Sequence, residues 1–188
     1  MEGDSLKATP KHFEIEQHIK ELNQMMSEQW QNFVFSGEWW ILLTLSIVPW
    51  FIWWKIVDKK RITEILLFGF FVIIIATFLD VVGWNNSGWF YPNTLLALCT
   101  PLFPIDYTLL PILYMLLFQY FSKWKSFVVA AFLMSAVFSF ILEPLSEWMN
   151  IYKELKWENI YSFPIYIIIG LVVKWFVEKI MRIQKNVS

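Results

Sequence analysis

Residues 65–80 read ILLFGFFVIIIATFLD, an uncharged run from Ile65 to Leu79 that ends at a single carboxylic acid, Asp80. A long apolar run of this kind is typical of a helix that crosses a membrane. Each run in the chain is shorter than the roughly 20 residues that a crossing needs, but Trp, Lys and Glu residues at the ends extend it to a full span. The four other runs are Trp39–Trp54, Tyr107–Ser122, Ser126–Leu142 and Asn159–Val173. The sequence therefore predicts an all-α integral membrane bundle of five transmembrane helices.

The composition favours the same class of protein. Of the 188 residues, 57% are hydrophobic and only 16% are charged, whereas charged residues make up about a quarter of an ordinary soluble domain. The net charge of −1 gives no basic field, so we expect no nucleic-acid partner. The single cysteine, Cys99, and the two histidines, His12 and His18, have no metal-ligand spacing, so we expect no metal site and no other cofactor.

Residues 1–37 form a separate N-terminal segment. After Thr9 and Pro10, which resemble a helix start, apolar residues recur at spacings of three and four, and charged residues occupy the other face. The apolar positions are Ile15, Ile19, Leu22, Met26, Trp30 and Phe33. Two interpretations remain: an amphipathic helix against membrane lipid or the outer face of the protein, or a docking helix for a second copy or another membrane protein. The transmembrane domain then covers residues 38–182, and residues 183–188 form a cytoplasmic tail.

The stretch between the second and third runs contains turn residues and prolines that argue against one continuous helix. We expect an outer loop over Asn85–Asn93. A short helical piece over Thr94–Thr100, which dips into the membrane or lies flat on it, is expected next. The third span then begins at Pro104.

Basic residues predict the orientation. The connections that follow the first and third runs, and the C-terminal end, are rich in lysine and arginine, whereas the opposite connections carry only Lys153 and Lys156. The basic positions are Lys55, Lys59, Lys60, Arg61, Lys123, Lys125, Lys174, Lys179, Arg182 and Lys185. By the positive-inside rule the C-terminus is cytoplasmic and the N-terminal helix lies outside.

Three acids stand out because carboxylates are costly in hydrocarbon. Asp80, Asp106 and Glu143 belong to three different spans. Counting from the expected cytoplasmic end of each span, at a rise of about 1.5 Å per residue, places all three about 24 to 27 Å up. The sequence therefore predicts a common acidic layer in the outer part of the membrane.

Other polar residues surround this layer. Ser135, Ser139, Glu143 and Glu147 recur every four positions and share one helix face, which is typical either of a polar pathway or of close helix packing. We assign no catalytic residue. The candidate ligand-binding or cation-binding residues are Asp80, Asp106, Glu143, Glu147, Ser139, Asn85 and Tyr107. Two structural alternatives remain: Asp106 as a charge in the first turn of its helix, and the whole layer as a hydrogen-bonded network that orders the outer loops.

Several short motifs carry a resemblance to a known family. They are Phe103–Tyr107 with Pro111, Glu143–Pro144, and Trp157 followed by Tyr161–Pro164. The region from Trp39 to Ile180 resembles a family of small uncharacterised multi-pass membrane proteins of spore-forming, Bacillus-like and Clostridium-like bacteria. The resemblance implies a bacterial plasma membrane and brings no established activity.

Three functions are compatible with these observations. The first is an outward-facing acidic pocket that binds or passes a small cation, an amine or a proton, alone or as a subunit of a larger complex. The second is a structural or sensory membrane protein that has no ligand and meets a partner. The third is an intramembrane enzyme that uses a carboxylic acid to isomerise or cyclise a lipid or isoprenoid.

Overall fold

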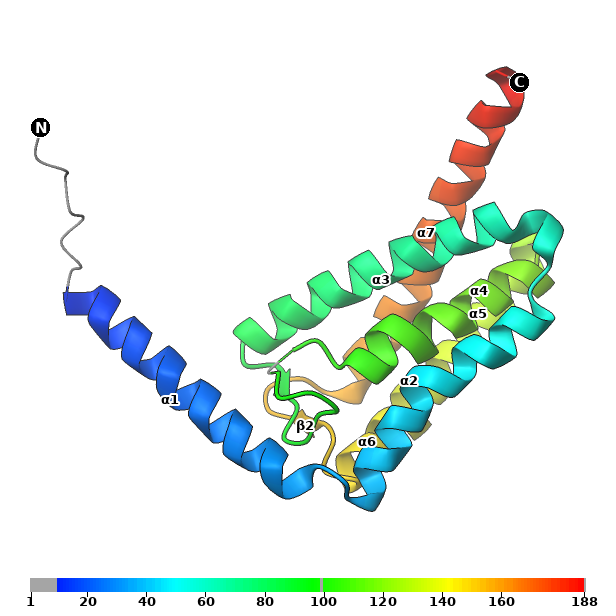
Figure 1. The fold of residues 1–188 in the computed structure, drawn as a ribbon. Coiled ribbons are helices and arrows are strands. Elements are labelled where there is room, and N and C mark those ends of the chain that lie inside the picture. The colour runs from blue at the N-terminus through cyan, green and yellow to red at the C-terminus, as the bar shows by residue number, and fades with distance from the viewer. Residues whose placement is uncertain (1–9, 99, 188) are drawn as a thin grey trace, which may run out of the picture.

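The computed structural model describes residues 10–98 and 100–187, which are mostly helical (Figure 1). Thr9 of the expected helix start, Cys99, and Ser188 of the expected tail lie outside the described residues. The helices are α1 (Pro10–Phe33), α2 (Gly37–Ile56), α3 (Ile62–Asn85), α4 (Leu110–Tyr120), α5 (Trp124–Val137), α6 (Glu143–Trp148) and α7 (Asn159–Val187). The shorter elements are the 3₁₀ turn η1 (Lys59–Arg61), the π-helical turns η2 (Ile105–Leu109) and η3 (Phe138–Leu142), and the strands β1 (Trp89–Phe90) and β2 (Lys153–Glu154).

Four helical segments among the described residues are long and apolar enough to cross a membrane. They are α2, η1 with α3, the continuous segment from α5 through η3 to α6, and α7. The remaining apolar helix, η2 with α4 (Ile105–Tyr120), is shorter than the others. The fold is therefore a membrane-type helical bundle, and the count of five spans stays a prediction.

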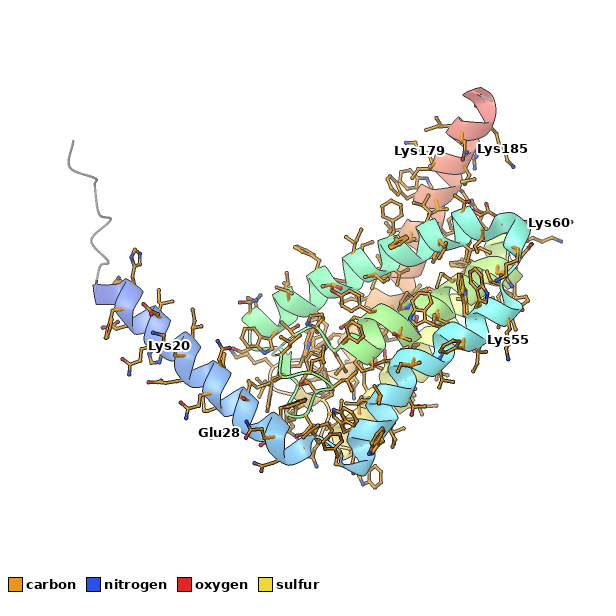
Figure 2. All side chains as sticks on the ribbon, in the orientation of Figure 1. Lys20, Glu28, Lys55, Lys60, Lys179 and Lys185 are labelled. Atoms are coloured by element: carbon orange, nitrogen blue, oxygen red, sulfur yellow. The ribbon has the colours of Figure 1, made fainter. Side chains whose placement is uncertain are left out.

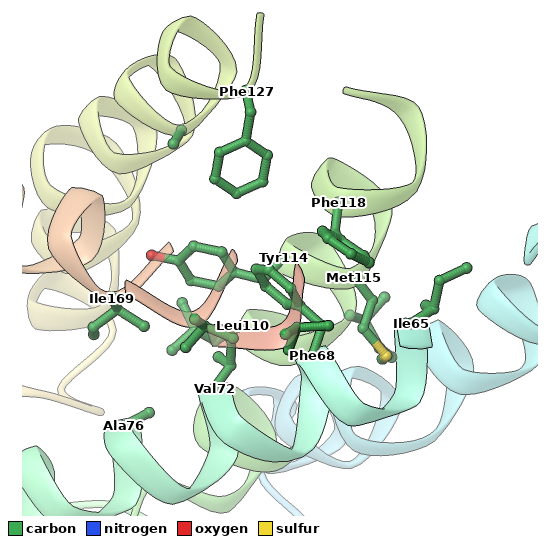
Figure 3. Packing of buried hydrophobic residues seen from close by; sticks show 14 of the residues in the cluster. Ile65, Phe68, Val72, Ala76, Leu110, Tyr114, Met115, Phe118, Phe127 and Ile169 are labelled. Carbon is green, nitrogen blue, oxygen red and sulfur yellow. The ribbon is translucent and has the colours of Figure 1, made fainter. Parts of the chain in front are cut away.

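The core of the bundle forms where one face of α3 meets α4, α5 and α7 (Figure 3). The buried residues of α3 recur at three and four positions, as an inward helix face requires. Phe68 lies at the centre: its ring stacks on Phe118 at 4.6 Å between centroids and meets the edge of Phe127 at 6.2 Å. Tyr114 of α4 is fully buried beside them. These contacts fix the rotation of α3 about its axis, and this rotation decides where Asp80 points.

A buried lysine closes the end of the bundle where α4 and α5 are connected. Lys174 of α7 is only 1% exposed; its Nζ donates to the Ser122 carbonyl at 3.0 Å and pairs with Glu178 at 2.8 Å. Its ammonium also lies about 5 Å from the rings of Phe118 and Phe127. Lys174 therefore ties α7 to the α4–α5 connection, and it is buried, unlike Lys179 and Lys185, which the orientation argument counts with it.

The α3–η2 and α6–α7 connections lie at the opposite end of the bundle and are called the outer connections, after the side on which the sequence predicts them. Together with residues of α1 and α2 they form a second, smaller hydrophobic core. Phe33, Leu42 and Leu95 are buried in it together with Tyr91, Leu102, Ile151 and Tyr152. The indole nitrogens of Trp30 and Trp39 both donate to the carbonyl of Leu95, at 2.9 and 3.1 Å. Helix α1 is thereby attached to the loops by its C-terminal half, while its N-terminal half extends away from the bundle (Figure 1).

The two outer connections are also paired with each other. Strands β1 and β2 are antiparallel, with Trp89 opposite Glu154 and Phe90 opposite Lys153. The Gly88 carbonyl accepts bonds from the backbone of residues 155–157, of which the shortest is 2.9 Å. This pairing holds the α3–η2 connection against the α6–α7 connection at the end of the bundle that carries the candidate site.

One expectation for this region was wrong. The described part of Thr94–Thr100 contains no helix, and α3 continues through Asn85, so the outer loop begins one residue later than expected. The physical reason is that backbone groups of the segment find other partners. The Leu95 carbonyl is taken by two indoles, and the Leu96 carbonyl accepts bonds from Thr94 Oγ1 and from the Leu98 amide.

Candidate functional site

Asp80 lies on the inward face of α3. Val72, Ala76 and Asp80 follow one another at intervals of four residues, so the acid continues the buried stripe by one turn. Asp80 is 5% exposed. Its Oδ1 accepts bonds from Trp89 Nε1 at 2.8 Å and from the Tyr91 hydroxyl, and its Oδ2 accepts from Thr100 Oγ1 at 2.7 Å. All three donors come from the α3–η2 connection, so three hydrogen bonds to Asp80 hold that loop against α3.

Tyr91 is held in the donating state. Burial, followed by the negative charge of Asp80, raises the pKa of Tyr91 well above its ordinary value. The hydroxyl therefore keeps its proton over the physiological range. It donates this proton to Asp80, while Trp89 Nε1 approaches the Tyr91 oxygen at 3.1 Å.

Asp106 is placed by a π-helical turn. The amide of Leu110 bonds the carbonyl of Ile105, five residues back, directly before Pro111. Proline has no amide hydrogen and its ring crowds the carbonyl four residues earlier, so a widened turn accommodates it. Asp106 lies in this turn and is 7% exposed. Its carboxyl group interacts directly with that of Asp80, and its Oδ2 has no hydrogen-bond partner among the described residues.

Glu143 is placed in the same way. The amide of Glu143 bonds the carbonyl of Phe138, five residues back, directly before Pro144. The Tyr166 hydroxyl donates to Glu143 Oε1 at 2.8 Å. The Ser162 hydroxyl also interacts with this carboxyl group, but Glu143 Oε2 is buried and no described residue meets it with hydrogen-bond geometry. Asp106 therefore lies within a π turn and Glu143 directly after one, a feature that is frequent at functional sites, and each acid keeps one carboxylate oxygen without a hydrogen bond.

The three acids line one cavity of about 200 Å³. Its walls come from α3, from η2 and α4, from η3 and α6, from α7, and from the paired outer connections. The polar and aromatic lining residues are Asp80, Trp89, Tyr91, Asp106, Glu143, Ser146, Tyr152, Trp157, Ser162 and Tyr166. Apolar residues such as Ala76, Leu110 and Ile169 close the end that faces the main core. The structure thus brings Asp80, Asp106 and Glu143 together from three different segments.

The other candidate residues do not line this cavity. Glu147 of α6 is partly exposed, and its Oε1 pairs with Lys153 at 2.7 Å. Asn85 is exposed and its side chain bonds the Val81 carbonyl of its own helix. The ring of Tyr107 stacks on Phe103, with centroids 5.2 Å apart.

Ser139 is fully buried, and its hydroxyl has no partner among the described residues. The π turn explains why Ser139 does not line the cavity with Glu143. Between Phe138 and Glu143 the backbone bond spans five residues, so positions four apart no longer lie above one another as they do in a regular α-helix. The expectation of a shared face for Ser139 and Glu143 therefore depended on a helical regularity that the chain does not keep.

Several lining residues were not among the candidates. Tyr91, Tyr152 and Trp157 belong to the outer connections, whose path has no local sequence signal. Ser162 and Tyr166 were within reach of sequence reasoning. They stand four apart in an apolar run, and both lie on the inward face of α7.

The arrangement offers carboxylate oxygens and aromatic faces around one cavity. No group of three or more His, Cys, Asp or Glu residues within residues 10–98 and 100–187 is placed to hold a metal ion. No protein family, no curated protein and no solved structure matches this chain.

Proposed function

We propose that this chain is a five-span protein of a bacterial plasma membrane whose outward-facing acidic cavity binds or passes a small cation, an amine or a proton, either alone or as a subunit of a larger complex. One observation carries the proposal. Asp106 and Glu143 line the same cavity, and each keeps a buried carboxylate oxygen without a hydrogen-bond partner among the described residues. An unpaired buried acceptor costs free energy that a bound cation or proton recovers.

The contact between Asp80 and Asp106 supports the same proposal. Two ionised carboxylates that interact directly inside a low-dielectric bundle repel each other. Asp80 already accepts hydrogen bonds from three donors, whereas Asp106 Oδ2 accepts none among the described residues, so a cation or proton at this pair is best placed on Asp106. A positive species there relieves the repulsion between the two carboxylates and also gives Asp106 Oδ2 a partner.

The arrangement of the helices supports five spans and the orientation. Lys55, Lys60, Lys179 and Lys185 gather at the end of the bundle opposite α1 and the paired connections (Figure 2). Helix α3 ends at the outer end and α5 begins at the basic end, so η2 with α4 runs between the two ends (Figure 1). By the positive-inside rule the basic end is cytoplasmic and the cavity end faces outward.

The orientation predicts a labelling pattern for single cysteines in a variant whose native Cys99 is replaced by serine. Glu14→Cys, on the exposed surface of α1, is expected to react with a membrane-impermeant maleimide on intact cells. Lys185→Cys, near the exposed C-terminal end of α7, is expected to react only after the membrane is permeabilised. Labelling of both positions from the same side would mean an even number of spans and would contradict the proposal.

The cavity predicts cation-dependent stability. The midpoint of thermal unfolding of the purified protein is expected to rise saturably with at least one of three additions, a sodium salt, an ammonium salt or acid, each tested at constant ionic strength. A ligand at a hundred times its dissociation constant stabilises by about 2.7 kcal/mol, which corresponds to several degrees. The rise is expected to be lost in Asp106→Asn and in Glu143→Gln, because each removes a charge that the ligand would meet.

Glu147→Gln provides the matched control for this experiment. It removes an acid of the same helix as Glu143, but one that pairs with Lys153 outside the cavity, so the ligand response is expected to remain. Equal responses of the wild type and all three variants would show that the cavity acids are not the binding groups.

A structural or sensory role without a ligand is the second candidate, and the bonding of Asp80 favours it. Three donors from one loop converge on this carboxylate, as expected if the acid serves to order the outer connections. Co-purification of a stoichiometric membrane partner, together with wild-type behaviour of Asp106→Asn and Glu143→Gln, would favour this role.

The N-terminal helix is the proposed contact with lipid, a second copy or a membrane partner. Leu22 and Met26 of α1 face the outer connections, whereas Ile15 and Ile19 on the same stripe are exposed. The helix runs across the direction of the bundle helices, and its exposed half extends beyond the bundle (Figure 1). This placement supports an amphipathic helix at the outer membrane surface.

A further inference from the structure

The size of the cavity bears on the class of ligand. A cavity of about 150 Å³ in a protein core accepts a molecule such as benzene. The acidic cavity measures about 200 Å³, which leaves room for a small organic molecule. A proton or a single dehydrated metal ion would leave most of this space unfilled.

The walls provide aromatic faces beside the acids. Trp89 and Trp157 meet edge to face with centroids 5.2 Å apart, and both rings line the cavity. Tyr91 and Tyr152, with centroids 6.1 Å apart, line it as well. Aromatic faces attract ammonium groups that lie within about 6 Å of the ring centre, most strongly for tryptophan and in the absence of water.

The charges complete the match to an organic cation. Asp106 is 93% buried, counted from its exposed fraction of 7%, and its free Oδ2 is an acceptor for an N–H donor or a counter-charge for a quaternary ammonium. Glu143 supplies a second free oxygen from a different wall. Calcium, by contrast, takes six to eight oxygen ligands, and among the described residues no cluster of three acids, histidines or cysteines is close enough to begin such a shell.

We propose that the acidic cavity binds an organic ammonium ion, with Asp106 and Glu143 as counter-charges and Trp89 and Trp157 as aromatic walls. This inference rests on the proposed cation-binding function and names its ligand class. Asp80 is a positioning residue in this site, because its bonds to Trp89 and Tyr91 hold two of the rings in place.

The test uses the full-length protein in lipid nanodiscs and measures the unfolding midpoint against increasing choline or butylammonium chloride. The reference ligands are 3,3-dimethylbutanol, which has the shape of choline without the charge, and sodium and calcium chloride at matched ionic strength. A saturable rise is expected with choline or butylammonium and with none of the references. Asp106→Asn and Glu143→Gln are expected to lose the rise, and Glu147→Gln is expected to keep it.

The aromatic wall has its own variant. Trp157→Leu is expected to weaken the apparent affinity for the ammonium ion by about threefold to thirtyfold, as loss of one ring contact implies.

An equal rise of the unfolding midpoint with 3,3-dimethylbutanol would show an apolar cavity and overturn the inference. A rise with sodium or calcium alone that depends on the acids would overturn the inference and leave the proposed function standing. If neither any cation nor low pH raised the midpoint, both the inference and the proposed function would be overturned. In the wild type alone, the comparison of choline with 3,3-dimethylbutanol and with sodium tests the inference even if a variant of Asp106 or Glu143 does not fold.

Discussion

Replacing Asp80 with alanine is expected to lower the free energy of unfolding by about 3 to 5 kcal/mol, because it removes the common acceptor of three buried donors. The indole of Trp89 and the hydroxyls of Tyr91 and Thr100 would all lose their bonds to this carboxylate. The same change leaves a void where the α3 stripe meets the cavity. Equilibrium unfolding of the detergent-solubilised protein, followed by circular dichroism, measures the loss.

Two variants separate the contribution of Asp80 from that of acids in general. Asp80→Asn keeps one carbonyl acceptor for Trp89 and Tyr91, so a smaller loss of about 1 to 2 kcal/mol is expected. Glu147→Ala removes a partly exposed acid paired with Lys153 and is expected to cost less than about 1 kcal/mol. If Asp80→Ala lowered the free energy of unfolding no more than Glu147→Ala, the hydrogen bonds around Asp80 would not stabilise the fold.

The sequence predicts that the three acids lie at one level along the bundle, and in the structure they line one cavity; their depth in a membrane stays a prediction. A charged residue at the end of an apolar run has a height that follows from counting alone. The direction of a side chain around its helix is harder to foresee. Asn85 and Tyr107 belong to the same outer level as the acids, yet neither lines the cavity. The height of a residue along the bundle depends on its position in the apolar run. The direction of its side chain depends on which neighbouring helix packs against its own helix.

The π turns and the outer loop depend on contacts between segments that are distant in the sequence. A proline predicts a disturbed helix, but the widened turns before Pro111 and Pro144 depend on neighbouring helices that hold the backbone in that shape. The loop over residues 86–104 adopts its path because two indoles from α1 and α2 take the carbonyl of Leu95. Contacts across some sixty positions of sequence leave no pattern within the segment itself, and for this reason the expected helix at Thr94–Thr100 was wrong.

Replacing Gly83 with alanine is expected to destabilise the protein by about 2 to 4 kcal/mol, because the new methyl group would collide with Trp89. A Cβ at Gly83 would lie 1.9 Å from Trp89 Cη2 and 2.2 Å from Cζ2, which are far closer than any real contact. The rigid indole must move as a whole, and its Nε1 then leaves Asp80, to which it donates at 2.8 Å. The change therefore acts on the acid network through a position that carries no polar atom in its side chain.

Gly69→Ala is the matched control, since both glycines lie within α3 and both substitutions gain the same helix propensity. A Cβ at Gly69 would meet Met115 Sδ at 2.6 Å, but a methionine side chain can rotate away, so a change below about 1 kcal/mol is expected. Gly83→Ala combined with Trp89→Leu is expected to cost less than the sum of the two single changes, because the smaller side chain leaves room for the methyl group. Additive losses, or a Gly83→Ala variant as stable as Gly69→Ala, would show that Trp89 is not held against α3 and would contradict its bond to Asp80.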